Sequence, residues 1–192
     1  MKVGVLALQG AFREHREVLD ALGVEAVDVR TPEQLGAVDA LILPGGESTT
    51  MSKLLDTSAL RAPVAELLAD GLPVLGTCAG MILLARDVVD GRPDQQSFGA
   101  VDIAVRRNAY GRQRDSFEAA LDVEGLTGGP FPGVFIRAPR IEAAGDGVEI
   151  LARHEGDAVF ARQRQVWVAS FHPELSGDLR LHERFLTESE RT

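Results

Sequence analysis

The segment that decides the fold is Pro73-Val74-Leu75-Gly76-Thr77-Cys78-Ala79-Gly80-Met81-Ile82-Leu83-Leu84-Ala85. Its apolar start is typical of a buried strand, and it runs through Gly-x-Cys-x-Gly into an apolar run that can begin a helix. Sharp strand-to-helix turns with a nucleophile at the tip have this pattern, here with sulfur in place of oxygen. The glycines are needed because such a turn strains the backbone and leaves no room for neighbouring side chains. The pattern therefore predicts that Cys78 stands above the end of a strand.

The chemical role of Cys78 has two interpretations. A lone cysteine among apolar residues is more often an inert, buried side chain. The flanking glycines and the strand-to-helix context favour a nucleophile, because the positive end of a helix stabilises the reactive thiolate. A nucleophile also needs a base and a group that orients the base, and the rest of the chain must supply both.

The composition is that of an ordinary globular protein. At 192 residues, 45% of them hydrophobic, the chain fits a single domain, 1–192, with its own core. A net charge of −9 argues against nucleic acid or an anionic membrane as the main partner. The single cysteine argues against a disulfide-stapled secreted domain, and neither a signal-like start nor a membrane-spanning run is present. We expect a cytoplasmic protein.

The order of predicted elements indicates the fold class. Residues 2–8, 24–29 and 39–43 are predicted strands, with a helix over 12–22 between the first two. Such alternation predicts a parallel sheet with helices on both faces. Short strand-like runs without helices between 101 and 171 predict antiparallel additions to that sheet. We therefore expect an α/β fold with three α/β/α layers and a mixed, mostly parallel, flavodoxin-like sheet.

Two further segments are candidates for ligand binding. Residues 44–50, Pro-Gly-Gly-Glu-Ser-Thr-Thr, follow a predicted strand, so their backbone N–H groups can face a ligand while Ser48 or Thr49 caps a helix. A plain strand-to-helix turn explains this segment equally well. Residues 106–114 form a basic island whose arginines suit a carboxylate, although most charged runs are solvated loops.

The last predicted strand, 166–171, delivers His172-Pro173-Glu174. In an extended chain His172 and Glu174 project to the same side, so the carboxylate can orient the imidazole. The remaining histidines have no partner evident in the sequence: His15 lies on a charged helix, His154 in a hairpin, and His182 on a helix face predicted to be solvated. No metal site is expected, because a His-Glu-x-x-His pattern is missing and one cysteine cannot build a thiolate site.

Cys78, His172 and Glu174 together suggest a Cys-His-Glu triad. This arrangement resembles class I, or triad, glutamine amidotransferases, and further motifs narrow the resemblance to the glutaminase subunits of pyridoxal 5′-phosphate synthases. The motifs are Leu8-Gln9-Gly10-Ala11-Phe12-Arg13-Glu14-His15, Leu43-Pro44-Gly45-Gly46-Glu47-Ser48-Thr49-Thr50, Gly76-Thr77-Cys78-Ala79-Gly80, Arg107-Asn108, Tyr110-Gly111-Arg112-Gln113, Phe135-Ile136-Arg137-Ala138-Pro139 and Ser170-Phe171-His172-Pro173-Glu174.

The resemblance implies hydrolysis of L-glutamine to L-glutamate and ammonia, with no cofactor. It implies an oxyanion hole formed by the N–H groups of Gly46 and Ala79. The glutamine-contacting positions that it implies are Gly46, Glu47, Ser48, Arg107, Ile136 and Arg137. The implied partner is a synthase subunit that uses the ammonia within a large hetero-oligomer.

Two alternatives stay open. The chain could serve another amidotransferase pair, such as imidazole glycerol phosphate synthase, because the elbow motif alone names only the superfamily. It could also be a non-catalytic, flavodoxin-like regulatory module in which Cys78 is incidental.

Overall fold

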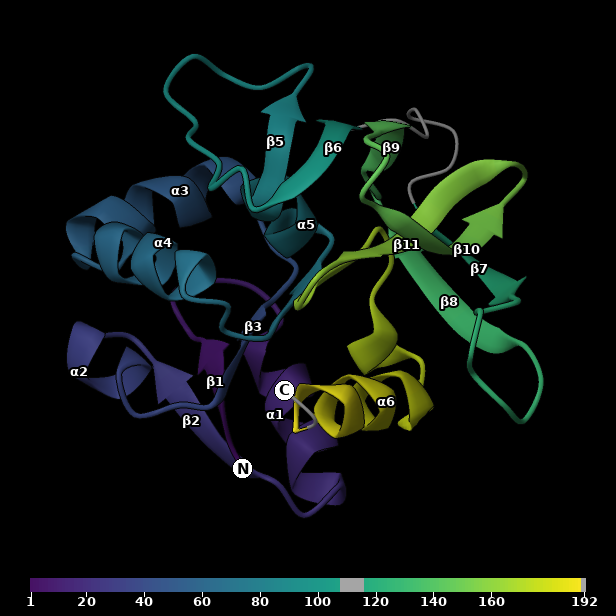
Figure 1. Cartoon of the computed structure of the whole chain (residues 1–192), viewed down its shortest axis with the longest axis horizontal. Helices are drawn as coiled ribbons and strands as arrows, with labels where there is room; N and C mark the ends of the chain where they lie inside the picture. The colour runs from purple at the N-terminus through teal and green to yellow at the C-terminus, as the bar shows by residue number, and fades with distance from the viewer. Residues whose placement is uncertain (108–115, 191–192) are drawn as a thin grey trace.

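The computed structural model describes residues 1–107 and 116–190 and is built around a seven-stranded sheet with the order β10-β11-β12-β4-β3-β1-β2 (Figure 1). The strands are β1 (Lys2–Leu6), β2 (Glu25–Val29), β3 (Ala40–Leu43), β4 (Val74–Thr77), β10 (Glu149–His154), β11 (Asp157–Gln163) and β12 (Val166–Ala169). Strands β12, β4, β3, β1 and β2 are parallel. Strand β11 pairs antiparallel with β12, and β10 pairs antiparallel with β11. The predicted mixed, mostly parallel sheet is confirmed.

Helices cover both faces of this sheet. They are α1 (Phe12–Ala21), α2 (Pro32–Leu35), α3 (Ser48–Thr57), α4 (Arg61–Ala69), α5 (Ala79–Leu84) and α6 (Arg180–Ser189), with a 3₁₀ turn η1 at Pro173–Leu175. Helices α1 and α6 lie on one face, and α3, α4 and α5 lie on the other (Figure 1). This is the predicted three-layer α/β/α arrangement. None of the described helices is long and apolar enough to cross a membrane.

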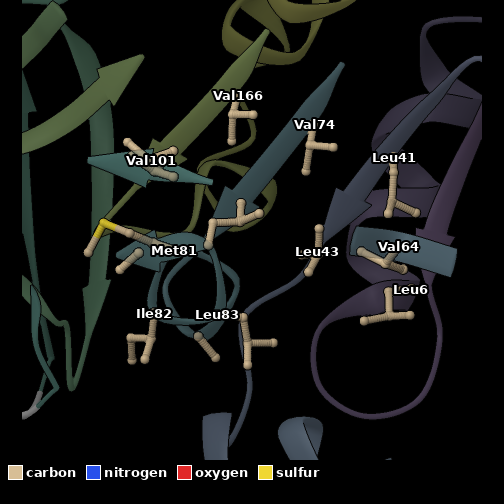
Figure 2. Close-up of a cluster of buried hydrophobic side chains, with 14 of the residues drawn as sticks. Leu6, Leu41, Leu43, Val64, Val74, Met81, Ile82, Leu83, Val101 and Val166 are labelled. Carbon is tan, nitrogen blue, oxygen red and sulfur yellow. The ribbon is translucent and has the colours of Figure 1, made fainter. Parts of the chain in front are cut away.

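The alternation of side chains along the strands creates two separate cores. In β3, Leu41 and Leu43 point to the α5 face, whereas Ala40 and Ile42 point to the α1 face. Figure 2 shows the first core, where Met81 and Leu83 of α5 pack with residues of β1, β3 and β4. The second core is rich in aromatic rings, including Phe131, Phe135, Phe160, Trp167, Phe171 and Phe185.

Two small sheets flank the central one, and here one prediction is wrong. Strands β5 (Ala85–Val88), β6 (Val101–Arg106) and β9 (Arg140–Ala144) form one sheet, in which β5 and β6 are parallel. Strands β7 (Ser116–Leu121) and β8 (Phe131–Ile136) form the other. Among the described strands that follow β4, only β10, β11 and β12 join the central sheet. Strand propensity reports a fit to a pleated, half-buried surface and does not identify the pairing partner.

Candidate active site

The turn at Cys78 has the strained geometry that its sequence predicts. Cys78 lies at the N-cap of α5 with φ 48° and ψ −101°, a backbone conformation that few non-glycine residues adopt. A Cβ atom on Gly80 would lie 2.0 Å from the carbonyl oxygen of Leu43, and one on Gly76 would lie 2.8 Å from the carbonyl carbon of Gly80. Both glycines are therefore required for the strand, the turn and the helix to pack this closely.

The helix behind Cys78 is anchored mainly by apolar packing. Every residue of α5 is buried, and the side chains of Met81, Leu83 and Leu84 are fully inaccessible. The backbone N–H of Cys78 donates to the carbonyl of Ala169 at 2.8 Å, which ties the turn to the end of β12. The sulfur atom thus has its position set by backbone geometry, and it lies 4.0 Å from the carbonyl oxygen of Ile136.

His172 and Glu174 lie together just beyond β12. The N–H of His172 donates to the carbonyl of Val134 at 2.8 Å, and Nδ1 of His172 lies 2.7 Å from Oε1 of Glu174. The extended conformation expected for this pair is wrong, because Pro173 begins the 3₁₀ turn η1. The turn nevertheless brings the carboxylate to the imidazole, and the Glu174 side chain is completely buried.

The structure brings the imidazole to the thiol as well. Cys78 and His172 line the same cleft, and a Cβ atom on Gly45 would lie 2.3 Å from Cε1 of His172 and 3.3 Å from Cβ of Cys78. Burial lowers the pKa of His172, but hydrogen bonds with Cys78 and Glu174 outweigh it and raise the pKa to about 10. At neutral pH the imidazole is therefore protonated and held between the sulfur and a carboxylate.

Glu174 is negatively charged and lies beside the protonated ring of His172. Burial raises the pKa of this carboxyl, but the nearby His15 and His172 rings outweigh burial, and its pKa lies below the ordinary value. The carboxylate consequently stays ionised and accepts the Nδ1 proton of His172. When His172 gives up one proton, this contact keeps the other on Nδ1 and so leaves Nε2 of the ring available for proton transfer.

A cleft of about 500 Å³ opens above these groups at the carboxyl ends of the central strands. Its lining includes all six residues implied as glutamine contacts, together with Cys78 and His172: Gly46, Glu47, Ser48, Arg107, Ile136 and Arg137. Ala79, the first residue of α5 and the neighbour of Cys78, is buried and does not line the cleft, and Glu174 contacts the ring of His172. Within the described part of the chain, no group of three or more His, Cys, Asp or Glu side chains is placed to hold a metal ion.

The turn before α3 is capped by Glu47, and the expected cap at Ser48 or Thr49 is wrong. The Glu47 carboxylate accepts hydrogen bonds from the N–H groups of Thr49 at 3.1 Å and Thr50 at 2.7 Å, and from the Thr50 hydroxyl at 2.6 Å. Burial raises the pKa of Glu47, but these hydrogen bonds with Thr50 and Thr49 dominate and lower it to about 2. An ionised carboxylate at a helix N-terminus is stabilised by the unpaired N–H groups there.

Arg107 is held at the mouth of the cleft by three polar partners. The backbone N–H of Arg107 donates to the carboxylate of Asp90 at 2.7 Å. In the guanidinium, Nη1 donates to the side-chain oxygen of Gln95 at 3.0 Å, and Nη2 lies 3.4 Å from the carboxylate of Glu47. The end of β6 thus places Arg107 in the lining of the cleft, and a role of this arginine in binding a carboxylate stays a prediction. The rest of the basic island, from Asn108 to Arg114, lies outside the described residues.

Two buried histidines were not expected near the site. His15 and His182 are both fully inaccessible, so a solvated position for His182 is wrong, and His15 does have partners. The helical spacing in the sequence could have predicted this burial. His15 lies on the same helix face as Val18 and Leu19, His182 lies on the same helix face as Phe185, and both faces are buried. His154 also has neighbours, because its ring stacks on Phe117 and packs against Phe135.

The architecture and the site together can be compared with known proteins. A crystal structure of a glutamine amidotransferase superposes with a TM-score of 0.92 at 51% identity, covering 98% of each chain. The structure of PurLQS from Thermotoga maritima, at 18% identity and a TM-score of 0.68 over 97% of each chain, shares the fold alone. The fold is therefore that of a glutamine amidotransferase.

Sequence relatives identify the family within the glutamine amidotransferases. The model of the SNO glutamine amidotransferase family matches residues 5–191, and the chain belongs to this family. A pyridoxal 5′-phosphate synthase subunit PdxT from Pelotomaculum thermopropionicum is 58% identical over 191 residues, which span 100% of this chain and 96% of the relative. The protein of the same name from Frankia alni is 55% identical over 185 residues, or 96% of this chain and 93% of the relative.

Proposed function

We propose that the chain, as a single glutaminase domain, hydrolyses L-glutamine to L-glutamate and ammonia and delivers the ammonia to the synthase subunit of a pyridoxal 5′-phosphate synthase. The observation that carries the proposal is the cleft in which Cys78 and His172 lie side by side, with Glu174 behind the imidazole. The family match and the name shared by the relatives support glutamine as the substrate and this synthase as the partner.

Cys78, His172 and Glu174 are the proposed catalytic groups. The thiolate of Cys78 attacks the carboxamide carbon of glutamine and forms a tetrahedral intermediate. His172 then gives its proton to the leaving nitrogen, the carbon–nitrogen bond breaks, and ammonia departs from a thioester. A water molecule, deprotonated by His172, attacks the thioester and releases glutamate and the free sulfur. Glu174 keeps the imidazole in the required orientation throughout.

The developing oxyanion needs hydrogen-bond donors, and we assign this role to the backbone N–H groups of Ala79 and Gly46. Ala79 follows the nucleophile directly and lies at the start of α5, and Gly46 lines the cleft from the turn before α3. Loss of one such donor typically costs roughly 3 kcal/mol of transition-state stabilisation.

The charged residues at the mouth of the cleft suit the amino-acid end of glutamine. Arg107 and Arg137 line the cleft and offer guanidinium groups to the α-carboxylate, while Ile136 and Ser48 border the side-chain path. Glu47 adds negative charge near the α-ammonium group. Glu47 also fixes the guanidinium of Arg107, from which it lies 3.4 Å.

Transfer to a partner follows from the chemistry of the product. Free ammonia is protonated in neutral water and loses its nucleophilic lone pair, so it has to pass through a protein interior to the second active site. The names of the relatives favour the pyridoxal pathway over another amidotransferase pair, and the ordered polar site disfavours an incidental cysteine. A large hetero-oligomer and a cytoplasmic location stay predictions.

The test is an assay of glutamate release from the chain alone, from the chain with its synthase subunit, and from Cys78→Ala with the synthase subunit. We expect glutamine-dependent release in the complex and none with Cys78→Ala, although the variant still binds the synthase. A glutamine-mimicking electrophile should label Cys78 in the complex and nowhere else. Release by Cys78→Ala at the wild-type rate would refute the role of the sulfur.

A further inference from the structure

A chain of buried polar groups continues from the proposed triad into the protein interior. Nε2 of His15 lies 3.3 Å from Oε2 of Glu174 and 3.2 Å from the hydroxyl of Thr77. Nδ1 of His15 lies 3.0 Å from Nε2 of His182. The side chains of His15, Glu174 and His182 are shielded from solvent, so each polar atom needs a partner within the protein.

These groups come from four different elements of the fold, and Glu174 lies in the 3₁₀ turn η1. His15 is on α1, Thr77 ends β4 next to Cys78, and His182 is on α6. Helices α1 and α6 lie on the same face of the central sheet (Figure 1). Neither histidine lines the cleft, so neither is placed to touch glutamine.

We infer that His15 is a positioning residue that holds Glu174 in place for His172, and that His182 sets the tautomer of His15. The inference rests on the proposed function of the triad and adds residues to it. Oε1 of Glu174 is engaged by His172, and Oε2 has no other polar partner within the described residues. The group that faces Oε2 is Nε2 of His15, at an ion-pair distance of 3.3 Å.

The arrangement of the nitrogen atoms selects one proton distribution. A carboxylate only accepts, so the nitrogen of His15 that faces it carries the proton, and its Nδ1 must then accept from Nε2–H of His182. The Nδ1 atom of His182 is left as a lone pair, and this atom has no hydrogen-bond partner among the described residues. In the reverse distribution the Thr77 hydroxyl can donate to Nε2 of His15, but the lone pair of Nε2 still faces the Glu174 carboxylate. That distribution also buries an unpaired N–H on His182, which costs more than a buried lone pair.

Both outer rings must be neutral for this arrangement. Burial lowers the pKa of His15, against the opposing effect of Glu174, and burial together with His15 lowers the pKa of His182 to about 3. The titratable groups that face Glu174 are His15 and His172, and those that face His15 are Glu174, His172, His182 and Glu14. Across the neutral range, protons are therefore not expected to leave or enter the two outer rings.

The direct test is an NMR measurement of imidazole nitrogen shifts in the full chain, which has only four histidines to assign. We expect His15 and His182 to stay neutral from about pH 6 to about pH 9, a range that includes the ordinary histidine pKa of about 6.5, with the proton of each on Nε2. A proton on Nδ1 of His15 would overturn the inference, and this result is independent of any activity.

The kinetic test uses the complex with the synthase subunit. His15→Leu removes both contacts and should lower kcat by about 10-fold or more, the effect of losing an outer partner of a positioned histidine, with little change in KM for glutamine. His15→Leu also removes the Nε2–H group that lies 3.3 Å from Oε2, so the Glu174 carboxylate loses stabilisation and its pKa should rise. The acid limb of the pH–activity profile should therefore move to higher pH. His15→Gln keeps a hydrogen-bond donor toward Glu174 and should retain most of the wild-type kcat. The kcat of His182→Leu should lie between those of His15→Leu and His15→Gln.

Val18→Ala is the matched control, because it removes buried methyl groups from the same helix without touching the polar chain. Val18→Ala should lower the midpoint temperature of thermal unfolding and leave the acid limb of the pH–activity profile unchanged. If Val18→Ala moves that limb as far as His15→Leu does, or if His15→Leu leaves it in place, His15 is only a packing residue. Failure of wild-type activity in the same assay would instead refute the proposed function itself.

Discussion

The two faces of the central sheet hold the two halves of the proposed site by different means. On the α5 face Cys78 is positioned by a strained backbone, two required glycines and an entirely apolar helix. On the α1 and α6 face His172 is positioned by polar contacts through Glu174 to His15. The nucleophile thus depends on shape, and the base depends on charge and hydrogen bonding.

This difference separates the ways in which each half should fail. Crowding the close-packed turn raises steric energy that a rigid interior cannot relieve, so damage there appears as lost stability. Disturbing the polar half changes protonation and orientation, so damage there appears as lost activity and an altered pH profile.

The largest effect is expected from Gly80→Ala. Its Cβ atom would lie 2.0 Å from the backbone oxygen of Leu43, which belongs to a central strand and cannot move aside. We expect the free energy of unfolding to fall by more than about 4 kcal/mol, a size diagnostic of a broken core, as measured by urea denaturation. Gly36→Ala is the control, because the nearest atom there is 3.6 Å away. Equal stability of the two variants would contradict the steric argument.

Glu174→Gln should have the next largest effect, and on activity. The amide cannot stabilise the imidazolium, so the pKa of His172 should fall from its value of about 10, and kcat should fall roughly 10²- to 10⁴-fold. Glutamate release by the complex gives the rate, and NMR titration of the ring gives the pKa. A full rate combined with a lowered pKa would show that the charge on His172 is not needed.

The pH dependence of stability should report the charged imidazole. The folded-state pKa of His172 is raised from 6.5 to about 10, so its contribution is fully present below 6.5 and is lost as pH rises toward 10. The difference in free energy of unfolding between wild type and His172→Gln should therefore shrink over this interval. A difference that grows with pH would mean that the imidazole is buried in its neutral form.

The smallest effect is expected at the mouth of the cleft. Arg107→Lys keeps the charge but loses the planar fork, so KM for glutamine should rise about 10-fold, equal to the loss of one charge-assisted hydrogen bond, with kcat nearly unchanged. Arg86→Lys, an exposed arginine paired with Asp87, is the control and should leave KM unaltered. A fall in kcat alone would place Arg107 in the chemical step.

Several features were predictable because neighbours along the chain determine them. The strand, the sharp turn and the helix around Cys78 follow from Gly-x-Cys-x-Gly between apolar runs, and Pro173 keeps His172 and Glu174 close whether the backbone is extended or turned. The alternation of strands and helices in the first half likewise predicts the parallel sheet. In each case, residues a few positions apart contain the whole signal.

Other features depend on packing between distant segments. His15 and His182 are 167 residues apart, and their contact exists only because α1 and α6 share a face of the sheet. The sorting of the later strands into a central sheet and two small sheets is of the same kind, since each strand could have paired with several others.

The amino-acid sequence by itself determined the elbow at Cys78, the nearby pair of His172 and Glu174, and the parallel α/β core, because local backbone sterics and side-chain periodicity are sufficient for these. Only the tertiary structure decided that two histidines with ordinary helical surroundings in the sequence are buried beside the carboxylate of Glu174. Burial depends on which surfaces meet, and a residue spacing that suits a solvated helix also suits a buried one.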